Sequence, residues 1–170
     1  MKTKKVIVTP YDPQWPANFE AIRRELAEAL GSLALRIEHV GSTSVLGLSA
    51  KPIIDLDVVI SDDSVFPEVK ESLARIGYLH EGDLGIAQRE AFCYQGKEHL
   101  QKHHLYVCPA NSRELRRHIV FRDYLRTHPD AVKSYSEAKE MAARLYSDDI
   151  DGYIRSKSPC IEEIYAQCGL

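Results

Sequence analysis

The sequence lacks a long apolar run. After the basic residues 1–5, the first apolar segment covers only residues 6–8. A membrane span needs about 20 apolar residues, and the apolar core of a signal peptide needs about 7 to 15. We therefore expect a cytoplasmic protein that has no membrane partner.

The sequence also lacks an excess of charge of one sign. It has 22 Lys and Arg against 25 Asp and Glu, which gives a formal net charge of −3 at pH 7. A general nucleic-acid-binding domain needs a basic surface that displaces counterions from phosphates. The charge balance therefore argues against general nucleic-acid binding, although it leaves room for a local basic groove.

Paired cysteine motifs and repeats are missing as well. Four cysteines are scattered without C-x-x-C spacing, and in a reducing compartment such thiols are core or surface residues to which we assign no chemistry: Cys93, Cys108, Cys160 and Cys168. The 170 residues are 44% hydrophobic and 28% charged, with no low-complexity tract. We expect one globular domain over residues 1–170.

Two acidic residues interrupt an apolar run at residues 53–60, IIDLDVVI. The run predicts a buried strand, whose period of two places Asp55 and Asp57 on one face and Leu56 on the other, in a core. Carboxylates held side by side are costly to bury, and a divalent cation is the usual compensation. Oxygen ligands favour Mg²⁺ or Mn²⁺. The alternative is a half-exposed strand with ordinary surface carboxylates.

Gly41 and Ser42 follow a second expected strand at residues 33–40. Small residues at this position predict a sharp turn whose bare backbone N–H groups can hold a phosphate, although Gly and Ser are also the default turn residues. Twelve residues separate Ser42 from Asp55. A phosphate turn and a metal-binding carboxylate pair on consecutive strands indicate metal-assisted handling of a nucleoside triphosphate.

The pattern Val40-Gly41-Ser42 followed by Asp55-Leu56-Asp57 resembles that of the nucleotidyltransferase superfamily. The longer strings at 37–44 (IEHVGSTS), 51–55 (KPIID) and 121–125 (FRDYL) resemble the GrpB family, and the likeness runs from about residue 11 to the C-terminus. That family usually has Val-Pro-Gly-Leu after the serine loop, whereas this chain has Val-Leu-Gly-Leu at 45–48. The missing proline should loosen the loop without removing a ligand.

The order of the expected elements predicts an α+β fold, with a nucleotidyltransferase-like mixed β-sheet covered by helices on one side and a helical C-terminal part from about residue 111. Besides the two strands above, we expect helices at 13–30 and 62–77 and strands at 78–80, 89–95 and 103–107. A capping box at Asn111 and Glu114 starts the first C-terminal helix, the second runs from 129 to about 146, and the last runs from 147 or 149 to 167, with an interruption before Pro159.

Catalysis in the superfamily implies a third carboxylate on a later strand, where this chain has histidine and tyrosine. By resemblance, His104 matches a histidine that is common on the equivalent strand of the family. A neutral imidazole can ligate a metal or take a proton near pH 7. Glu90, on the preceding strand, is the alternative third carboxylate.

Further phosphate ligands are expected around the turn. Thr43 and Ser44 belong to the turn itself, and Lys51 is placed at the entry to the metal strand, where it can reach a triphosphate or remain a solvated loop residue. If the first C-terminal helix crosses the sheet, Arg89 and His118 should cluster on the sheet face with Arg117 and Arg122, and these two arginines can give bidentate phosphate contacts. Otherwise they form the polar side of an amphipathic helix.

Two functions follow. In the first, a metal-dependent nucleotidyltransferase, Gly41 and Ser42 hold the phosphates of a nucleoside triphosphate, Asp55 and Asp57 bind Mg²⁺ (or Mn²⁺), and the hydroxyl of an unknown small-molecule acceptor attacks the α-phosphate. In the second, the domain is a catalytically inactive module that binds a nucleotide or a phosphometabolite. GrpB-like domains joined to dephospho-CoA kinase imply, by resemblance, a connection to coenzyme A metabolism.

Overall fold

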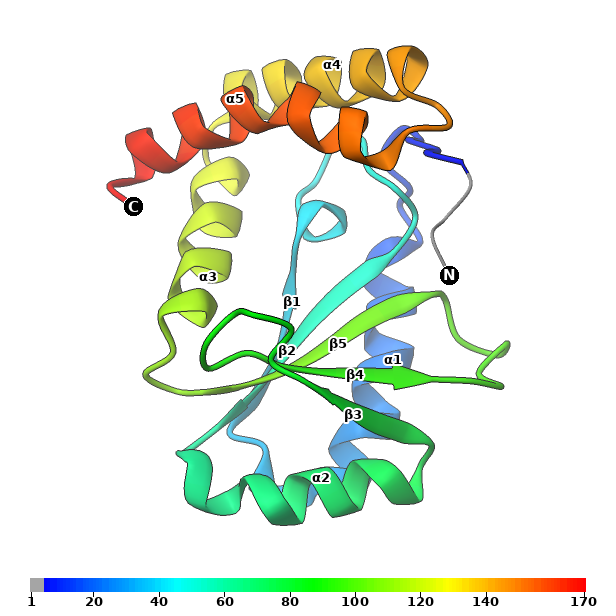
Figure 1. The fold of residues 1–170 in the computed structure, drawn as a ribbon, viewed down its shortest axis with the longest axis vertical. Helices are drawn as coiled ribbons and strands as arrows, with labels where there is room; N and C mark the ends of the chain where they lie inside the picture. Colours follow the sequence, from blue (N-terminus) through cyan, green and yellow to red (C-terminus); the bar gives the residue numbers. More distant parts are fainter. Residues whose placement is uncertain (1–4) are drawn as a thin grey trace.

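Five strands form one mixed β-sheet in the order β1-β2-β5-β4-β3 (Figure 1). The computed structural model describes residues 5–170, so the basic residues 1–4 noted above lie outside the description. Strands β2 and β5 are parallel and the other neighbouring strands are antiparallel. The strands are β1 Arg36–Val40, β2 Ile54–Ile60, β3 Tyr78–Gly82, β4 Glu90–Tyr94 and β5 His103–Pro109.

Helices α1 (Trp15–Leu30) and α2 (Phe66–Arg75) cover one face of the sheet. Apolar residues of α1 recur at helical spacing, and Ile22, Leu26 and Leu30 are buried against the strands. Alternate residues of β2 point into the same core, among them Leu56, which is fully buried. The prediction that Leu56 faces a core is therefore confirmed, and the intervening residues of β2 face the other way.

The C-terminal part is helical, as predicted, and consists of α3 (Arg113–Arg126), α4 (Pro129–Leu145) and α5 (Ile150–Cys168). Helices α4 and α5 lie side by side across one end of the sheet (Figure 1). Helix α3 packs on the face opposite α1, where Val59, Cys108 and Leu115 form a small apolar cluster. The expectation that helices cover only one side was wrong, because α3 covers part of the second face.

Most boundaries differ from the prediction by a few residues, and two details are corrected. Ser112, rather than Asn111, caps α3, because its hydroxyl accepts a hydrogen bond from the backbone N–H of Leu115 (3.3 Å). Helix α5 continues through Pro159 without the expected interruption. The Ser158 hydroxyl donates to the Ile154 carbonyl one turn earlier (2.6 Å), and Pro159 has no N–H to offer the carbonyl of Arg155. Within residues 5–170, no helix is both long and apolar enough to cross a membrane.

Candidate functional site

Asp55 and Asp57 lie on the face of β2 that points away from α1, and each contacts a histidine. The register of β2 and β5 sets His104 beside Asp55, and its Nδ1 donates to Asp55 Oδ1 at 3.0 Å. His118 reaches the strand from α3, and its Nδ1 donates to Asp57 Oδ2 at 2.6 Å. The structure thus brings the predicted His104 to the aspartates, together with His118, which was expected at this face if the first C-terminal helix crossed the sheet.

Burial makes Asp57 the unusual member of the pair. Its side chain has 0% exposure, whereas Asp55 is partly exposed. Burial raises the pKa of Asp57, and the hydrogen bond and charge of His118 offset part of that rise. Burial alone would lower the pKa of His118, but the hydrogen bond and the charge of Asp57 outweigh it, so the pKa of His118 is raised. Each partner therefore favours the charged form of the other, while burial still raises the pKa of Asp57 overall.

The second oxygen of Asp57 has no partner. Asp57 Oδ1 is buried and makes no hydrogen bond within residues 5–170. Buried carboxylate oxygens are nearly always bonded, because an unpaired one loses its hydration without compensation. A cation beside Oδ1 would supply that compensation. No three His, Cys, Asp or Glu side chains of residues 5–170 are grouped so that they could hold a metal ion, so further ligands would have to come from a substrate.

The predicted phosphate turn lies against the aspartates. Gly41 has a φ of 71°, and a Cβ at this position would collide with the Asp55 carboxylate, so only glycine fits. The next three residues form a short 3₁₀ turn, Ser42–Ser44. Two of its hydroxyls maintain the turn, because Thr43 Oγ1 bonds His39 Nε2 (2.9 Å) and Ser44 Oγ donates to the Gly41 carbonyl (2.5 Å). Ser42 and Thr43 also line a cavity.

That cavity has a volume of about 190 Å³, and three lysines from separate elements converge on it: Lys51 before β2, Lys139 from α4 and Lys157 from α5. Lys139 is only 3% exposed, and its Nζ donates to Ser42 Oγ and to the Ser49 carbonyl (3.3 Å). Burial lowers the pKa of all three lysines, that of Lys157 to about 8. The other lining residues are Ser42, Thr43, Ala50, Ile53, Asp55, His104 and Tyr153.

Lys139 and Lys157 were missed by the sequence analysis. Each occupies an ordinary position in an amphipathic helix, and Lys139 is 97 residues from the serine that it contacts. Nothing local distinguishes such a lysine from a solvated one, because its burial depends on how α4 and α5 pack over the turn. Lys51, in contrast, was predicted, and the structure brings it to the cavity.

Three predicted residues are not brought to the site. Glu90 pairs in register with Val107, which places it on the α1 side of the sheet, and it accepts a hydrogen bond from His80 Nε2 (2.8 Å). Its proposed role as third carboxylate is therefore corrected, because the sheet separates it from the aspartates. The two predicted arginines of α3 do not line the cavity either.

Both arginines are engaged within the fold instead. Arg122 is buried, pairs with Glu38 (2.6 Å) and donates to the His39 carbonyl (3.1 Å), so it ties α3 to β1 behind the turn. The Arg117 guanidinium lies 4.6 Å from the centre of the Tyr165 ring. Helix α3 does cross the sheet, but the side chains of Arg117 and Arg122 contact neighbouring elements of the fold and do not line the cavity.

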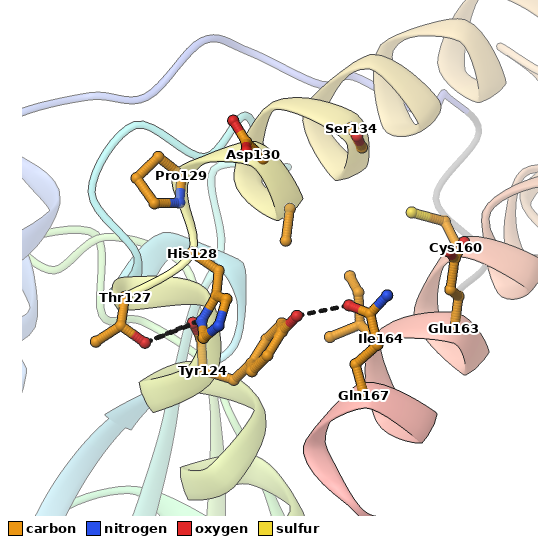
Figure 2. A pocket seen from close by; sticks show the side chains of 11 residues that line it. Tyr124, Thr127, His128, Pro129, Asp130, Ser134, Cys160, Glu163, Ile164 and Gln167 are labelled. Atoms are coloured by element: carbon orange, nitrogen blue, oxygen red, sulfur yellow. Dashed lines mark hydrogen bonds between the residues drawn. The ribbon is translucent and has the colours of Figure 1, made fainter.

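A second hollow, of about 430 Å³, lies among α3, α4 and α5 (Figure 2). Tyr124 and His128 are stacked in it with ring centres 3.8 Å apart, and the Tyr124 hydroxyl donates to Gln167 (2.5 Å). None of the predicted site residues lines this hollow. We therefore take the smaller cavity beside Asp55 as the candidate site.

Comparison with known sequences finds one matching family model and several similar proteins. The family model described as GrpB protein matches residues 5–167. UPF0157 protein PA4798 of Pseudomonas aeruginosa is 36% identical over 94% of the chain, and UPF0157 protein YqkA of Bacillus subtilis is 32% identical over 94%. The chain spans only 66% and 46% of these two relatives. A dephospho-CoA kinase of Mycolicibacterium paratuberculosis is 29% identical over 94% of the chain, which spans 45% of that protein.

Comparison with solved structures finds proteins that share the fold of this chain. The conserved protein GrpB from Enterococcus faecalis superimposes with a TM-score of 0.84 at 34% identity, over 95% of this chain and 96% of that one. The Cid1 poly(U) polymerase bound to MgATP superimposes with a TM-score of 0.54 at 14% identity, over 77% of this chain and 45% of that one. The second likeness shows a nucleotidyltransferase fold. Together with the match over residues 5–167, these findings show that the chain belongs to the GrpB family.

Proposed function

We propose that the chain is a metal-dependent nucleotidyltransferase that moves a nucleotidyl group from a nucleoside triphosphate to a small hydroxyl-bearing acceptor. The observation that carries the proposal is the buried, unpartnered Oδ1 of Asp57, beside Asp55 and next to a lysine-lined cavity. An orphaned carboxylate oxygen requires a cation, and the lysines require an anion. A metal complex of a triphosphate supplies both.

Asp55 and Asp57 fit Mg²⁺ or Mn²⁺, which bind in proteins through one or two carboxylates together with substrate phosphates. When bound, such an ion neutralises charge on the phosphates and favours departure of pyrophosphate. This arrangement agrees with the missing third acidic ligand among residues 5–170. Two carboxylates from the protein suffice if the nucleotide completes the coordination.

The cavity residues hold the phosphates in this proposal. Ser42 and the backbone of Gly41 contact them from the turn, while Lys51, Lys139 and Lys157 surround them with positive charge. Three lysines against the one carboxylate of Asp55 leave the cavity cationic when the lysines are protonated. A polyphosphate is the ligand that matches that charge.

His104 is the proposed proton acceptor. Its imidazole is about half exposed at the edge of the cavity and bonds Asp55 through Nδ1, which leaves Nε2 free to take a proton from an acceptor hydroxyl. The acceptor oxygen then attacks the α-phosphate, the bond between the α-phosphate and the bridging oxygen breaks, and pyrophosphate leaves. The Asp55 carboxylate stabilises the imidazolium that forms.

The second candidate is a module that binds a nucleotide or phosphometabolite without turnover. It is favoured by the absence, within residues 5–170, of a third carboxylate grouped with the aspartates as a metal site, because Glu90 faces the opposite side of the sheet. The similarity to a dephospho-CoA kinase supports a link to coenzyme A metabolism for this alternative. Binding would use the same turn and lysines.

A turnover assay separates the two candidates. The full chain is incubated with ATP, CTP, GTP or UTP, Mg²⁺ or Mn²⁺, and a pool of small hydroxyl-bearing metabolites, and pyrophosphate release is measured. The enzyme releases pyrophosphate, and release falls at least a hundredfold in Asp55→Asn and in His104→Ala. His128→Ala, in the second hollow, is the control that retains activity. Nucleotide binding without pyrophosphate release under every condition would establish the module.

A further inference from the structure

Arg89 is a cation on the same face of the sheet as the aspartates. Ala91 pairs with Tyr106, and Tyr106 pairs with Asp57. Because alternate residues of a strand share a face, Arg89 lies on this face too, two residues before Ala91. Its guanidinium carbon is 4.2 Å from the centre of the Tyr106 ring, which confirms the placement.

One hydrogen-bond donor of the Arg89 side chain has no acceptor within residues 5–170. Its Nε is buried without an acceptor, and the only other such side-chain atom within residues 5–170 is Asp57 Oδ1. Arg89 takes no part in the ion pairs of its own face, which join His104 to Asp55 and His118 to Asp57. A guanidinium keeps its charge at every accessible pH, and buried donors nearly always have acceptors. The charge of Arg89 also acts on Asp57, whose pKa it lowers, but the unfilled Nε–H leaves room for a further anion or another strong acceptor.

The backbone fixes this arginine in place. Gln88 has a φ of 60°, a left-handed conformation that is rare for residues other than glycine. Its carbonyl accepts a hydrogen bond from the Ser112 hydroxyl (3.0 Å), at the start of α3. The loop before β4 is thus anchored to α3 at the residue that precedes Arg89, so the guanidinium is presented from a defined position.

Arg89 and the lysine-lined cavity lie on opposite sides of the aspartates. The cavity includes Asp55 and the segment before β2, whereas Arg89 lies beyond Tyr106, the residue in register with Asp57. We propose that Arg89 binds an anionic group of the acceptor, a phosphate or a carboxylate, so that the acceptor is an acidic small molecule with a hydroxyl group. This inference rests on the proposed transferase function, since it assigns the second substrate of the same site.

The test observes Arg89 directly and needs no turnover. In the ¹⁵N-labelled full chain, the Arg89 Nε–H signal is assigned by its loss in Arg89→Lys, which retains the charge but lacks the fork of donors. Glycerol 3-phosphate, glycerate, glycerol and choline are then titrated with Mg²⁺ and a nonhydrolysable triphosphate present. We expect glycerol 3-phosphate or glycerate to shift the signal, whereas neutral glycerol and cationic choline leave it unchanged.

Matched variants complete the test. Arg89→Gln should weaken binding of the anionic probe at least tenfold while triphosphate affinity stays within twofold, and Arg113→Gln, an exposed arginine of α3, should change neither. The inference is overturned if no anionic probe shifts the signal, or if the triphosphate alone shifts it and Arg89→Gln loses triphosphate affinity. Absence of pyrophosphate release would remove the transferase function but would leave the Arg89 titration interpretable, so the two failures can be told apart.

Discussion

His118 donates a 2.6 Å hydrogen bond to Asp57, a carboxylate with no solvent exposure. Removing one member of a buried ion pair leaves an uncompensated charge and costs about 3 to 5 kcal/mol. We expect His118→Ala to lower the free energy of unfolding by about 3 kcal/mol in urea denaturation with EDTA present, because His118 itself is partly exposed. The loss should shrink at low pH, where Asp57 can become protonated.

The control for this prediction is His99→Ala. His99 contacts Glu25 at 2.9 Å, but its side chain is 60% exposed, so its removal should cost less than about 1 kcal/mol. Equal losses for the two variants would contradict a special role for the buried pair. A double variant, His118→Ala with Asp57→Asn, should recover part of the stability that the single His118 variant loses.

The orphaned oxygen of Asp57 predicts a metal dependence. Asp57→Asn keeps the shape of the side chain and removes its charge. In thermal unfolding, Mn²⁺ with a nonhydrolysable triphosphate should raise the Tm of the unmodified chain, and this increase should disappear in the variant, since binding to the folded state is what stabilises it. Glu98→Gln, an exposed carboxylate elsewhere, should retain the increase. An unchanged increase in Asp57→Asn would show that the metal binds elsewhere.

The turn can be tested with two glycines of similar backbone conformation. Gly41 and Gly47 have φ values of 71° and 83°, so alanine is strained at both. A Cβ at Gly41 meets the Asp55 carboxylate, whereas a Cβ at Gly47 meets nothing within 4 Å. We expect triphosphate affinity, measured by calorimetry, to fall at least tenfold in Gly41→Ala, or about 1.4 kcal/mol, and much less in Gly47→Ala. Similar affinities in the two variants would exclude the turn as a phosphate site.

The lysine cavity predicts that triphosphate affinity depends on pH. Burial lowers the pKa of Lys157 to about 8, so its positive charge is present at pH 7 and is lost as the pH rises through that value. Affinity should therefore fall severalfold between pH 7 and pH 9.5. Lys157→Gln should bind more weakly at pH 7 and show a shallower decline. If the variant and the unmodified chain decline in parallel, Lys157 does not contact the ligand.

His39 predicts a separate dependence of stability on pH. Burial lowers its pKa from 6.5 to about 4 in the folded protein, so below pH 6.5 the unfolded chain binds a proton that the folded chain does not. Stability is therefore lost as the pH falls from 6.5 toward 4, by up to about 3 kcal/mol. In urea unfolding between pH 7 and pH 4.5, His39→Gln should lose less stability than the unmodified chain. A variant with the same pH dependence would assign the acid sensitivity to other groups.

The sequence correctly predicted those features of the site whose geometry is determined by the local pattern of residues. The alternation of β2 places Asp55 and Asp57 on one face, and the sharp turn at Gly41 follows from its residue types. The position of Glu90 was predicted wrongly because pairing of β4 with β5 decides which face each residue takes, and a shift of one residue reverses it. His118 could be expected at the aspartates only on the condition that its helix crosses the sheet, and Lys139 was missed, because both contacts depend on the docking of helices that are 61 and 97 residues from their partners.

The segment from 45 to 50 belongs to two apolar cores at once. Val45 and Leu48 are buried with α4 and α5, while Ala50 is buried with the sheet and α1. In a mutational scan, substitutions at Val45 and Leu48 would therefore reduce cellular abundance and ligand binding together, although neither side chain lines the cavity. Correcting activity for abundance would be needed before either position is counted as part of the active site, and homologues that differ here should have compensating changes in α4 or α5.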